Sequence, residues 1–193
     1  MRTIERLALA LVLLLPLPLL AAPAHWDVPG LLQALHRDHP ESVRYTEEKR
    51  MEALSSTMRL HGTLTYRPPN TVEKRVGPPY NATYTVQGER ITLQQDGQPP
   101  HQLSLQDAPG LAGLIAGFRA VLSGDYSELD RYYRSELEGD WAQWKLSLTP
   151  RGGRLASMLH SVVVRGHRRH IDSFTMEEAG GDSTVLRIEG PAH

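Results

Sequence analysis

The side chains that could do chemistry fall into a few clusters, and the first is rich in histidine. His167 and His170 flank two arginines, and His160 lies nearby in the sequence. A zinc site needs such imidazoles to converge on one point. Positions three apart on a strand point to opposite faces, and the arginines would repel a cation. We therefore expect no metal site here, but a solvated basic strand or turn.

Adjacent carboxylates and serines are the other candidates for catalysis. Glu47-Glu48 and Glu177-Glu178 are neighbours, so on strands each pair would split between two faces, which suits solvent exposure better than acid–base work. Three serines lack the sequence context of a nucleophile elbow: Ser55, Ser56 and Ser161. The chain has no phosphate-binding glycine loop. These patterns predict a protein that is not an enzyme and uses no cofactor.

Composition excludes further classes of protein. The chain has 193 residues, a formal net charge of −1 and no cysteine. Its length fits one soluble domain. The lack of cysteine excludes a disulfide framework and a thiolate zinc site. The near-neutral charge argues against a nucleic-acid partner, which would require a basic surface.

The N-terminal segment, residues 1–24, has the pattern of a signal peptide. Two arginines flank the start of an apolar run over residues 7–22, which is short for a membrane span and is broken by two prolines. Small residues follow, so we predict cleavage before His25 and export of residues 25–193 as one domain. Cleavage after Ala22 and an uncleaved anchor are the alternatives.

Most of the remaining chain alternates between apolar and polar residues. The alternation is clearest over residues 60–66, 80–86 and 142–148, and it continues in the last thirty or so residues. Such half-buried strands are typical of antiparallel sheets. Segments rich in Pro, Gly, Asn and Asp separate the strands. The pattern predicts a mainly β protein with some helix.

One segment, residues 107–123, has helical periodicity instead. We expect Asp107 to cap this helix and Gly124 to end it. Glycines and alanines form one side, and each interior glycine costs about 1 kcal/mol relative to alanine. The helix must therefore pack on something, for which we expect the concave side of the sheet. The glycines either pack closely there or let the helix move as a lid. The larger apolar residues form the other side: Leu111, Leu114, Ile115, Phe118, Val121 and Leu122.

Shorter helices are expected over residues 28–38 and 127–133. A concave sheet with an apolar face and a helix across it could hold an acyl chain, since burial of each CH₂ group contributes about 0.8 kcal/mol. The same residues could instead form a filled core.

The order of the segments resembles that of a known family. A Tyr-Thr-Glu-Glu-Lys-Arg strand is followed by Gly62, Leu64 and Tyr66, then by Arg67-Pro68-Pro69, the helix, a Trp-rich strand and a closing hairpin. This order resembles the LolA family of periplasmic outer-membrane lipoprotein carriers, and more narrowly its divergent LolA-like branch. The resemblance covers residues 43–190.

The resemblance implies a fold and a function. The fold would be an incomplete antiparallel β-barrel, or half-barrel, closed by a helical lid over a hydrophobic cavity. The function would be to shield an acylated cargo (a lipoprotein, a glycolipid or another lipid) on its way from an inner-membrane donor to an outer-membrane acceptor. The protein would then be a monomer in the periplasm of a Gram-negative bacterium.

The resemblance also implies site residues. Arg67 matches a family arginine that helps to hold the lid closed and takes part in cargo transfer. The lid would present Leu111, Leu114, Ile115 and Phe118 to the cavity. The cavity wall would include Leu64, Tyr66, Tyr84 and Trp144.

Departures from the family leave the cargo open. Residues 71–74 are mostly polar where the family usually has an aromatic residue. The alternative function is that of an enzyme or enzyme-accessory protein that binds a hydrophobic biosynthetic intermediate in the same cavity, and clustered polar residues inside the cavity would favour it. A third possibility is an interaction module that recruits an envelope partner by its sheet edge.

Overall fold

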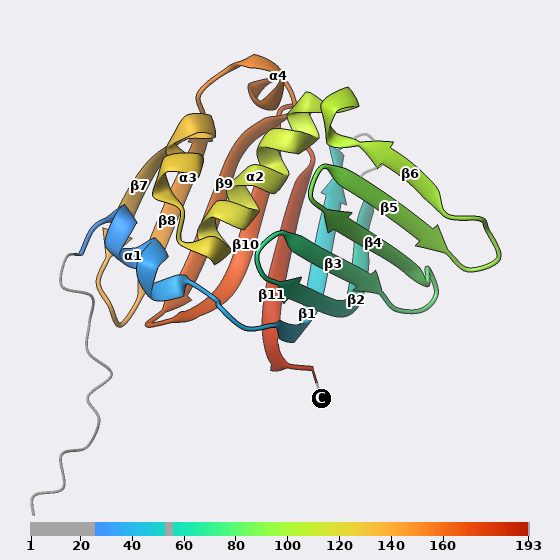
Figure 1. Cartoon of the computed structure of the whole chain (residues 1–193), viewed down its shortest axis with the longest axis horizontal. Helices are drawn as coiled ribbons and strands as arrows, with labels where there is room; N and C mark the ends of the chain where they lie inside the picture. The colour runs from blue at the N-terminus through green and yellow to red at the C-terminus, as the bar shows by residue number, and fades with distance from the viewer. Residues whose placement is uncertain (1–25, 53–55, 193) are drawn as a thin grey trace, which may run out of the picture.

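The fold is an open antiparallel sheet, seen in a computed structural model that describes residues 26–52 and 56–192. The predicted signal peptide lies outside these residues. The described strands follow the order β6-β5-β4-β3-β2-β1-β11-β10-β9-β8-β7, so the first and last members, β6 and β7, are the two edges of the sheet. The sheet is not closed into a barrel (Figure 1).

The strands cover most of the described chain. Their bounds are β1 (Glu41–Met51), β2 (Ser56–Arg67), β3 (Thr71–Val76), β4 (Ala82–Gln87), β5 (Arg90–Gln95), β6 (His101–Ser104), β7 (Tyr133–Gly139), β8 (Trp144–Pro150), β9 (Leu159–His167), β10 (His170–Glu178) and β11 (Ser183–Pro191). The helices are α1 (Val28–Leu35), the 3₁₀ turn η2 (Leu105–Asp107), α2 (Pro109–Ser123), α3 (Tyr126–Tyr132) and α4 (Gly153–Ala156).

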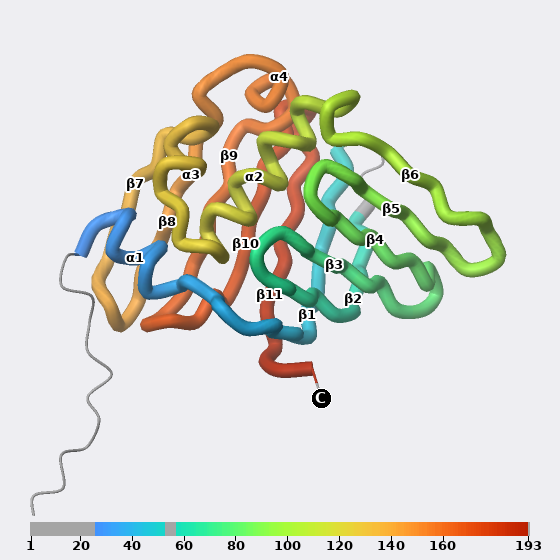
Figure 2. The backbone as a smooth tube through the Cα atoms, in the orientation of Figure 1, coloured from blue at the N-terminus to red at the C-terminus, as the bar shows by residue number. Residues whose placement is uncertain are grey.

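The α-helices all lie on one side of the sheet, which we call its inner face (Figure 1). Helix α2 runs diagonally across this face, and β3 to β6 curl toward the same side (Figure 2). Apolar residues of α2 pack against both β4–β5 and β10. The expected half-barrel with a helix across it is confirmed.

The main core lies between the helices and the half of the sheet that contains β7 to β11. The inner-face side chains there include Leu146, Val164 and Phe174, which follow one cross-strand row. A smaller cluster of Val86, Ile91 and η2 lies at the other end, beneath α2. Successive side chains on a strand point to opposite faces, so the polar residues that alternate with these apolar ones lie on the opposite face.

Several predicted boundaries shift by one to three residues, and the helix expected over residues 28–38 ends at Leu35. Strand β4 starts after residue 81, because Asn81 adopts a positive φ of 44° in the preceding turn. Asp107 does not cap α2, since it belongs to η2 and Ala108 precedes the helix without a side-chain cap. Gly124 does end the helix, with a φ of 75°. Among the described helices, none is long and apolar enough to cross a membrane.

Candidate functional site

Helix α2 is the centre of the candidate site, and its most buried side is the glycine side. Gly113 and Gly117 let the helix backbone approach Tyr133 at the start of β7. A side-chain carbon at Gly117 would lie only 2.6 Å from Tyr133 Cε2. The Tyr133 hydroxyl donates a hydrogen bond to the Gly113 carbonyl over 3.3 Å. Close packing therefore explains the glycines, and it joins α2 to α3, α4 and β7.

The four predicted lid residues on the other side of α2 are only half buried, although Val121 further along that side is buried. Leu111 and Ile115 pack against Val86 and Ile91 on β4 and β5. Phe118 lies on Phe174 of β10 with ring centroids 5.0 Å apart. The four predicted lid residues thus share one face that looks toward the sheet: Leu111, Leu114, Ile115 and Phe118.

Arg119 joins this side of α2 to two turns of the sheet. Its Nη2 atom donates to the carbonyl oxygens of Asn70, 2.9 Å away, and Gly88, 2.6 Å away. These residues lie in the β2–β3 and β4–β5 turns. The buried Nε atom has no hydrogen-bond partner within the described chain. Burial lowers the pKa of the Arg119 guanidinium, and the neighbouring Tyr66 opposes this shift.

Arg67, the residue predicted to hold the lid, lies on the outer face of the sheet. Its guanidinium contacts Glu73 there and not α2. Strand alternation places it opposite in direction to the buried Tyr66. Its Nη1 atom is 3.3 Å from Glu73 Oε2, and its side chain is 47% exposed. Of the two arginines, it is Arg119 that hydrogen-bonds from α2 to the turns. Sequence reasoning missed Arg119, although its place on the helical segment was a signal that could have identified it.

The predicted wall residues are divided between the two halves of the sheet. Leu64, Tyr66 and Tyr84 all lie on the inner face of β2 and β4, where Tyr84 remains 41% exposed. Trp144 lies on β8, separated from β2 by four strands, and its Nε1 donates to the Arg168 carbonyl over 3.0 Å. The structure therefore groups the first three with α2, and places Trp144 in the main core.

A set of polar side chains on the inner face was not expected from the sequence. Glu47 is 5% exposed and forms an ion pair with Lys74, whose Nζ lies 5.3 Å from the centre of the Tyr45 ring. Tyr84 lies directly opposite Lys74 on the neighbouring strand. We call these four residues the polar cluster: Tyr45, Glu47, Lys74 and Tyr84. Alternation did place Glu47 and Glu48 on opposite faces, but the expected exposure is wrong for Glu47, which faces inward.

Tyr45 is the most deeply buried member of the polar cluster. It is 1% exposed, and its hydroxyl has no hydrogen-bond partner among residues 26–52 and 56–192. Burial raises the pKa of the Tyr45 hydroxyl, and the nearby Glu47 and Tyr84 add to the shift. The hydroxyl therefore stays protonated and remains a hydrogen-bond donor.

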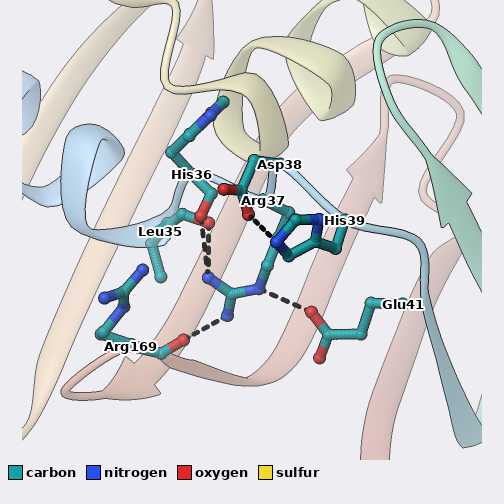
Figure 3. A network of polar contacts seen from close by, with 7 residues as sticks. All are labelled: Leu35, His36, Arg37, Asp38, His39, Glu41 and Arg169. Carbon is teal, nitrogen blue, oxygen red and sulfur yellow. Dashed lines mark hydrogen bonds and ion pairs between the residues drawn. The ribbon is translucent and has the colours of Figure 1, made fainter.

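Arg37, which follows α1, anchors the C-terminal end of α2 by its backbone, and Figure 3 shows the further contacts of its guanidinium. The Arg37 backbone N–H donates to the Leu122 carbonyl over 3.0 Å. Its guanidinium donates to the carbonyls of Leu35 and Arg169, and pairs with Glu41 at 2.6 Å. One side chain thus joins the end of α1, the β9–β10 turn and the start of β1.

The histidines of the β9–β10 turn do not diverge, contrary to the expectation from strand spacing. His167 ends β9 and His170 begins β10, so the two are cross-strand partners with stacked rings 5.2 Å apart. His167 Nδ1 lies 2.9 Å from Asp172 Oδ1. In the described part of the chain, no group of three or more His, Asp or Glu side chains is arranged to hold a metal ion.

A shallow depression of about 500 Å³ lies at the β5–β6 edge and not beneath α2. It is lined by Gln87, Glu89, Arg90, Gln102, Leu103 and Ser104. Beneath α2, the half-buried lid residues rest on the sheet.

An open antiparallel half-barrel with helices across its inner face defines the class of this protein. Residues 20–192 match the profile of the family described as outer membrane lipoprotein carrier protein LolA-like, and the chain belongs to that family. The resemblance inferred from segment order is confirmed. A search of curated proteins finds no match in sequence.

Solved structures with a similar fold are distant in sequence. A LolA superfamily protein from Nitrosomonas europaea is 10% identical, with a TM-score of 0.48 over 86% of this chain and 92% of that one. A domain from Vibrio parahaemolyticus, described as an outer membrane lipoprotein-sorting protein, is 11% identical, with a TM-score of 0.48 over 84% and 88%. The Pseudomonas aeruginosa MucA/MucB complex matches at 15% identity and a TM-score of 0.36, over 87% and 59%.

Proposed function

We propose that this protein is a carrier that shields the acyl part of a lipoprotein or lipid between α2 and the inner face of the sheet. Membership of the LolA-like family supports a carrier. The observation that carries the proposal is the uneven packing of α2. Its glycine side is tightly packed, whereas the four lid residues on its other side are only half buried against the sheet.

Uneven packing indicates where the protein would open. Tight contacts with Tyr133 and the Arg37 anchor hold α2 to the half of the sheet that contains β7 to β11. On the other side, α2 is held by Arg119 and by contacts of Leu111 and Ile115 with β4 and β5. Separation of α2 from β3–β5 would break only the second set. An acyl chain entering there would replace these contacts by its own.

The energetics of such an exchange favour a long acyl chain. Each buried CH₂ group contributes about 0.8 kcal/mol, so a chain of about 12 to 16 carbons could offset the loss of several side-chain contacts. The carrier would act in the periplasm after removal of residues 1–24. It would take cargo from an inner-membrane donor and release it to an outer-membrane acceptor, without catalysing a reaction.

One observation favours the alternative function, that of an accessory protein or enzyme for a hydrophobic biosynthetic intermediate. The inner face is not purely apolar, since Glu47 and Lys74 form an ion pair on it. A cargo with a polar group would suit this surface better than a plain hydrocarbon. Both functions use the same site beneath α2, and they differ in what happens to the bound molecule.

Native mass spectrometry after exposure of the purified chain to a bacterial lipid extract tests the carrier. We expect a bound acylated molecule whose mass identifies the cargo, and weaker binding by Ile115→Asn, which places an amide on the lid face. Met158→Asn is the matched control, because Met158 is 48% exposed on the glycine side of α2. Failure to bind any acylated molecule would overturn the carrier. Recovery of a chemically altered ligand would favour the enzyme.

A further inference from the structure

We infer that the polar cluster binds the ester or amide carbonyl at the head of an acyl chain. The inference rests on the proposed carrier function, because it assigns the residues that bind the polar end of the cargo. Tyr45 and Glu47 belong to the strand segment that carries the family resemblance, whereas Lys74 lies in residues 71–74, where the sequence departs from the family pattern.

The Tyr45 hydroxyl is a buried donor that the described chain leaves without a partner. A buried polar group without a hydrogen bond is unfavourable, and native proteins retain few of them. Tyr45 lies on the inner face of β1, near the middle of the sheet order. Its hydroxyl is therefore available for an acceptor atom that the protein does not itself supply.

Gly62 makes room for this arrangement. Gly62 is the cross-strand partner of Tyr45, and a side-chain carbon there would lie 1.8 Å from the Arg75 carbonyl oxygen and 3.2 Å from Tyr45 Cε1. The Lys74 ammonium lies near the face of the Tyr45 ring and pairs with Glu47. The Tyr45 ring thus lies next to the Gly62 backbone and near the Lys74 ammonium.

The balance of charge and of donors selects the kind of head group. Glu47 and Lys74 neutralise each other, so the polar cluster has no net charge. An ammonium has three N–H donors, and Lys74 uses one on Glu47. The hydroxyls of Tyr45 and Tyr84 add further donors. The polar cluster therefore has N–H and O–H donors free to bind a ligand, but no excess positive charge. Such a site fits a neutral carbonyl oxygen, because the Glu47 carboxylate would repel an anionic group.

The polar cluster is continuous with the proposed acyl site. Tyr84 is 41% exposed and Lys74 is partly exposed, whereas Tyr45 and Glu47 are buried. The residues next to them on the same inner face, Leu64 and Leu93, are half buried. A carbonyl could reach Tyr45 once α2 and β3–β5 separate, with its hydrocarbon chain lying along the leucines toward α2.

A comparison of two ligands that differ in their head tests this inference. Methyl palmitate and a linear alkane of matched length are delivered from cyclodextrin to the purified chain, and binding is measured by native mass spectrometry. We expect the ester to bind about 3- to 10-fold more tightly than the alkane, as one or two added hydrogen bonds would give. Tyr45→Phe should abolish this preference, and it should fold normally because the hydroxyl has no protein partner.

Tyr133→Phe is the matched control, since it removes the hydroxyl of another buried tyrosine that is bound to Gly113. It should keep the preference for the ester. Tyr84→Phe is a second variant at an exposed position and should weaken the preference. Palmitate is measured in the same way. Equal binding of methyl palmitate and the alkane by the wild type, or stronger binding of palmitate than of methyl palmitate, would overturn the inference but leave the carrier standing. Failure to bind any of these ligands would instead count against the carrier.

Discussion

Arg119 on α2 donates a hydrogen bond to the carbonyl of Gly88, 2.6 Å away in the β4–β5 turn. This contact connects the helix that crosses the sheet to the half of the sheet that it touches least tightly. A second bond from the same nitrogen reaches Asn70 in the β2–β3 turn. Both bonds would have to break if α2 and β3–β5 separate to admit a ligand.

Replacement of Arg119 by leucine should therefore loosen this side of α2. Loss of a hydrogen-bonded charged partner typically lowers the free energy of unfolding by about 1.5–3 kcal/mol. We expect a smaller loss here, near 1 kcal/mol, because the accepting carbonyls can reach water. Hydrogen exchange in β4 and β5 and release of a bound acyl ligand should both become faster.

Arg67→Leu is the comparison for Arg119→Leu. The family resemblance predicts that Arg67 controls cargo release, but its guanidinium pairs with Glu73 on the outer face. Since an exposed ion pair contributes about 0–1 kcal/mol, stability should change little. The release rates of a bound acyl ligand from the two variants show which arginine has the larger effect on release. Unchanged release in Arg119→Leu together with faster release in Arg67→Leu would contradict the role given to Arg119.

Gly117→Ala should destabilise the protein, although alanine is the better helix former. The added carbon would lie 2.6 Å from the ring of Tyr133, which is 1% exposed and cannot move aside. Overpacking typically costs about 1–3 kcal/mol, and the gain in helix propensity offsets about 1 kcal/mol of it. We expect a net loss of up to about 2 kcal/mol in urea unfolding. Gly180→Ala, at an open position, should leave stability unchanged.

Removal of one member of the Glu47–Lys74 pair should cost more than removal of both. Lys74→Met leaves a carboxylate that is 5% exposed without its partner, and breaking such a pair can cost about 3–5 kcal/mol. The partial exposure of Lys74 reduces our expectation to about 2 kcal/mol. The double variant Glu47→Leu with Lys74→Met should regain most of this loss. A double-mutant cycle in urea that gives additive effects would show that the pair is not coupled.

Stability should fall above about pH 10, the ordinary pKa of tyrosine. Burial raises the pKa values of Tyr45, Tyr66 and Tyr133, so the folded protein retains protons that the unfolded chain loses. Unfolding then releases protons, and the free energy of unfolding decreases as pH rises. Urea unfolding between pH 8 and 11 measures the slope. Tyr133→Phe should make it shallower, and an unchanged slope would contradict this assignment.

Alternation along the chain was sufficient to predict the β-rich fold, because a half-buried strand must alternate between its two faces. Helical periodicity over residues 107–123, with its interior glycines, predicted a helix packed on the concave side of the sheet. It could not rank the two sides of α2. Large apolar residues normally mark the buried side of a helix, but here Gly113 and Gly117 are more buried than Leu111 and Ile115. Small side chains let the backbones come closer, and that gain depends on Tyr133, which is distant in sequence.

The same limit applies to the histidines and to the polar cluster. Spacing along one strand suggested that His167 and His170 diverge, but a turn between them makes them partners on two strands. Lys74 stood out in the sequence only as part of a polar segment. Its role depends on register, because β3 pairs with β2 so that Lys74 lies opposite Leu64 on the inner face, where it pairs with Glu47 on β1.

By itself, the sequence determined the class of fold, the place of the helix and the family, since these depend on local periodicity and on the order of segments. Only the tertiary structure decided which arginine binds the turns, which side of α2 is tightly packed and which charged residues face inward. Those outcomes depend on contacts between Arg119 and Gly88, Gly117 and Tyr133, and Lys74 and Glu47. Each pair is brought together by strand register and curvature, which no local pattern records.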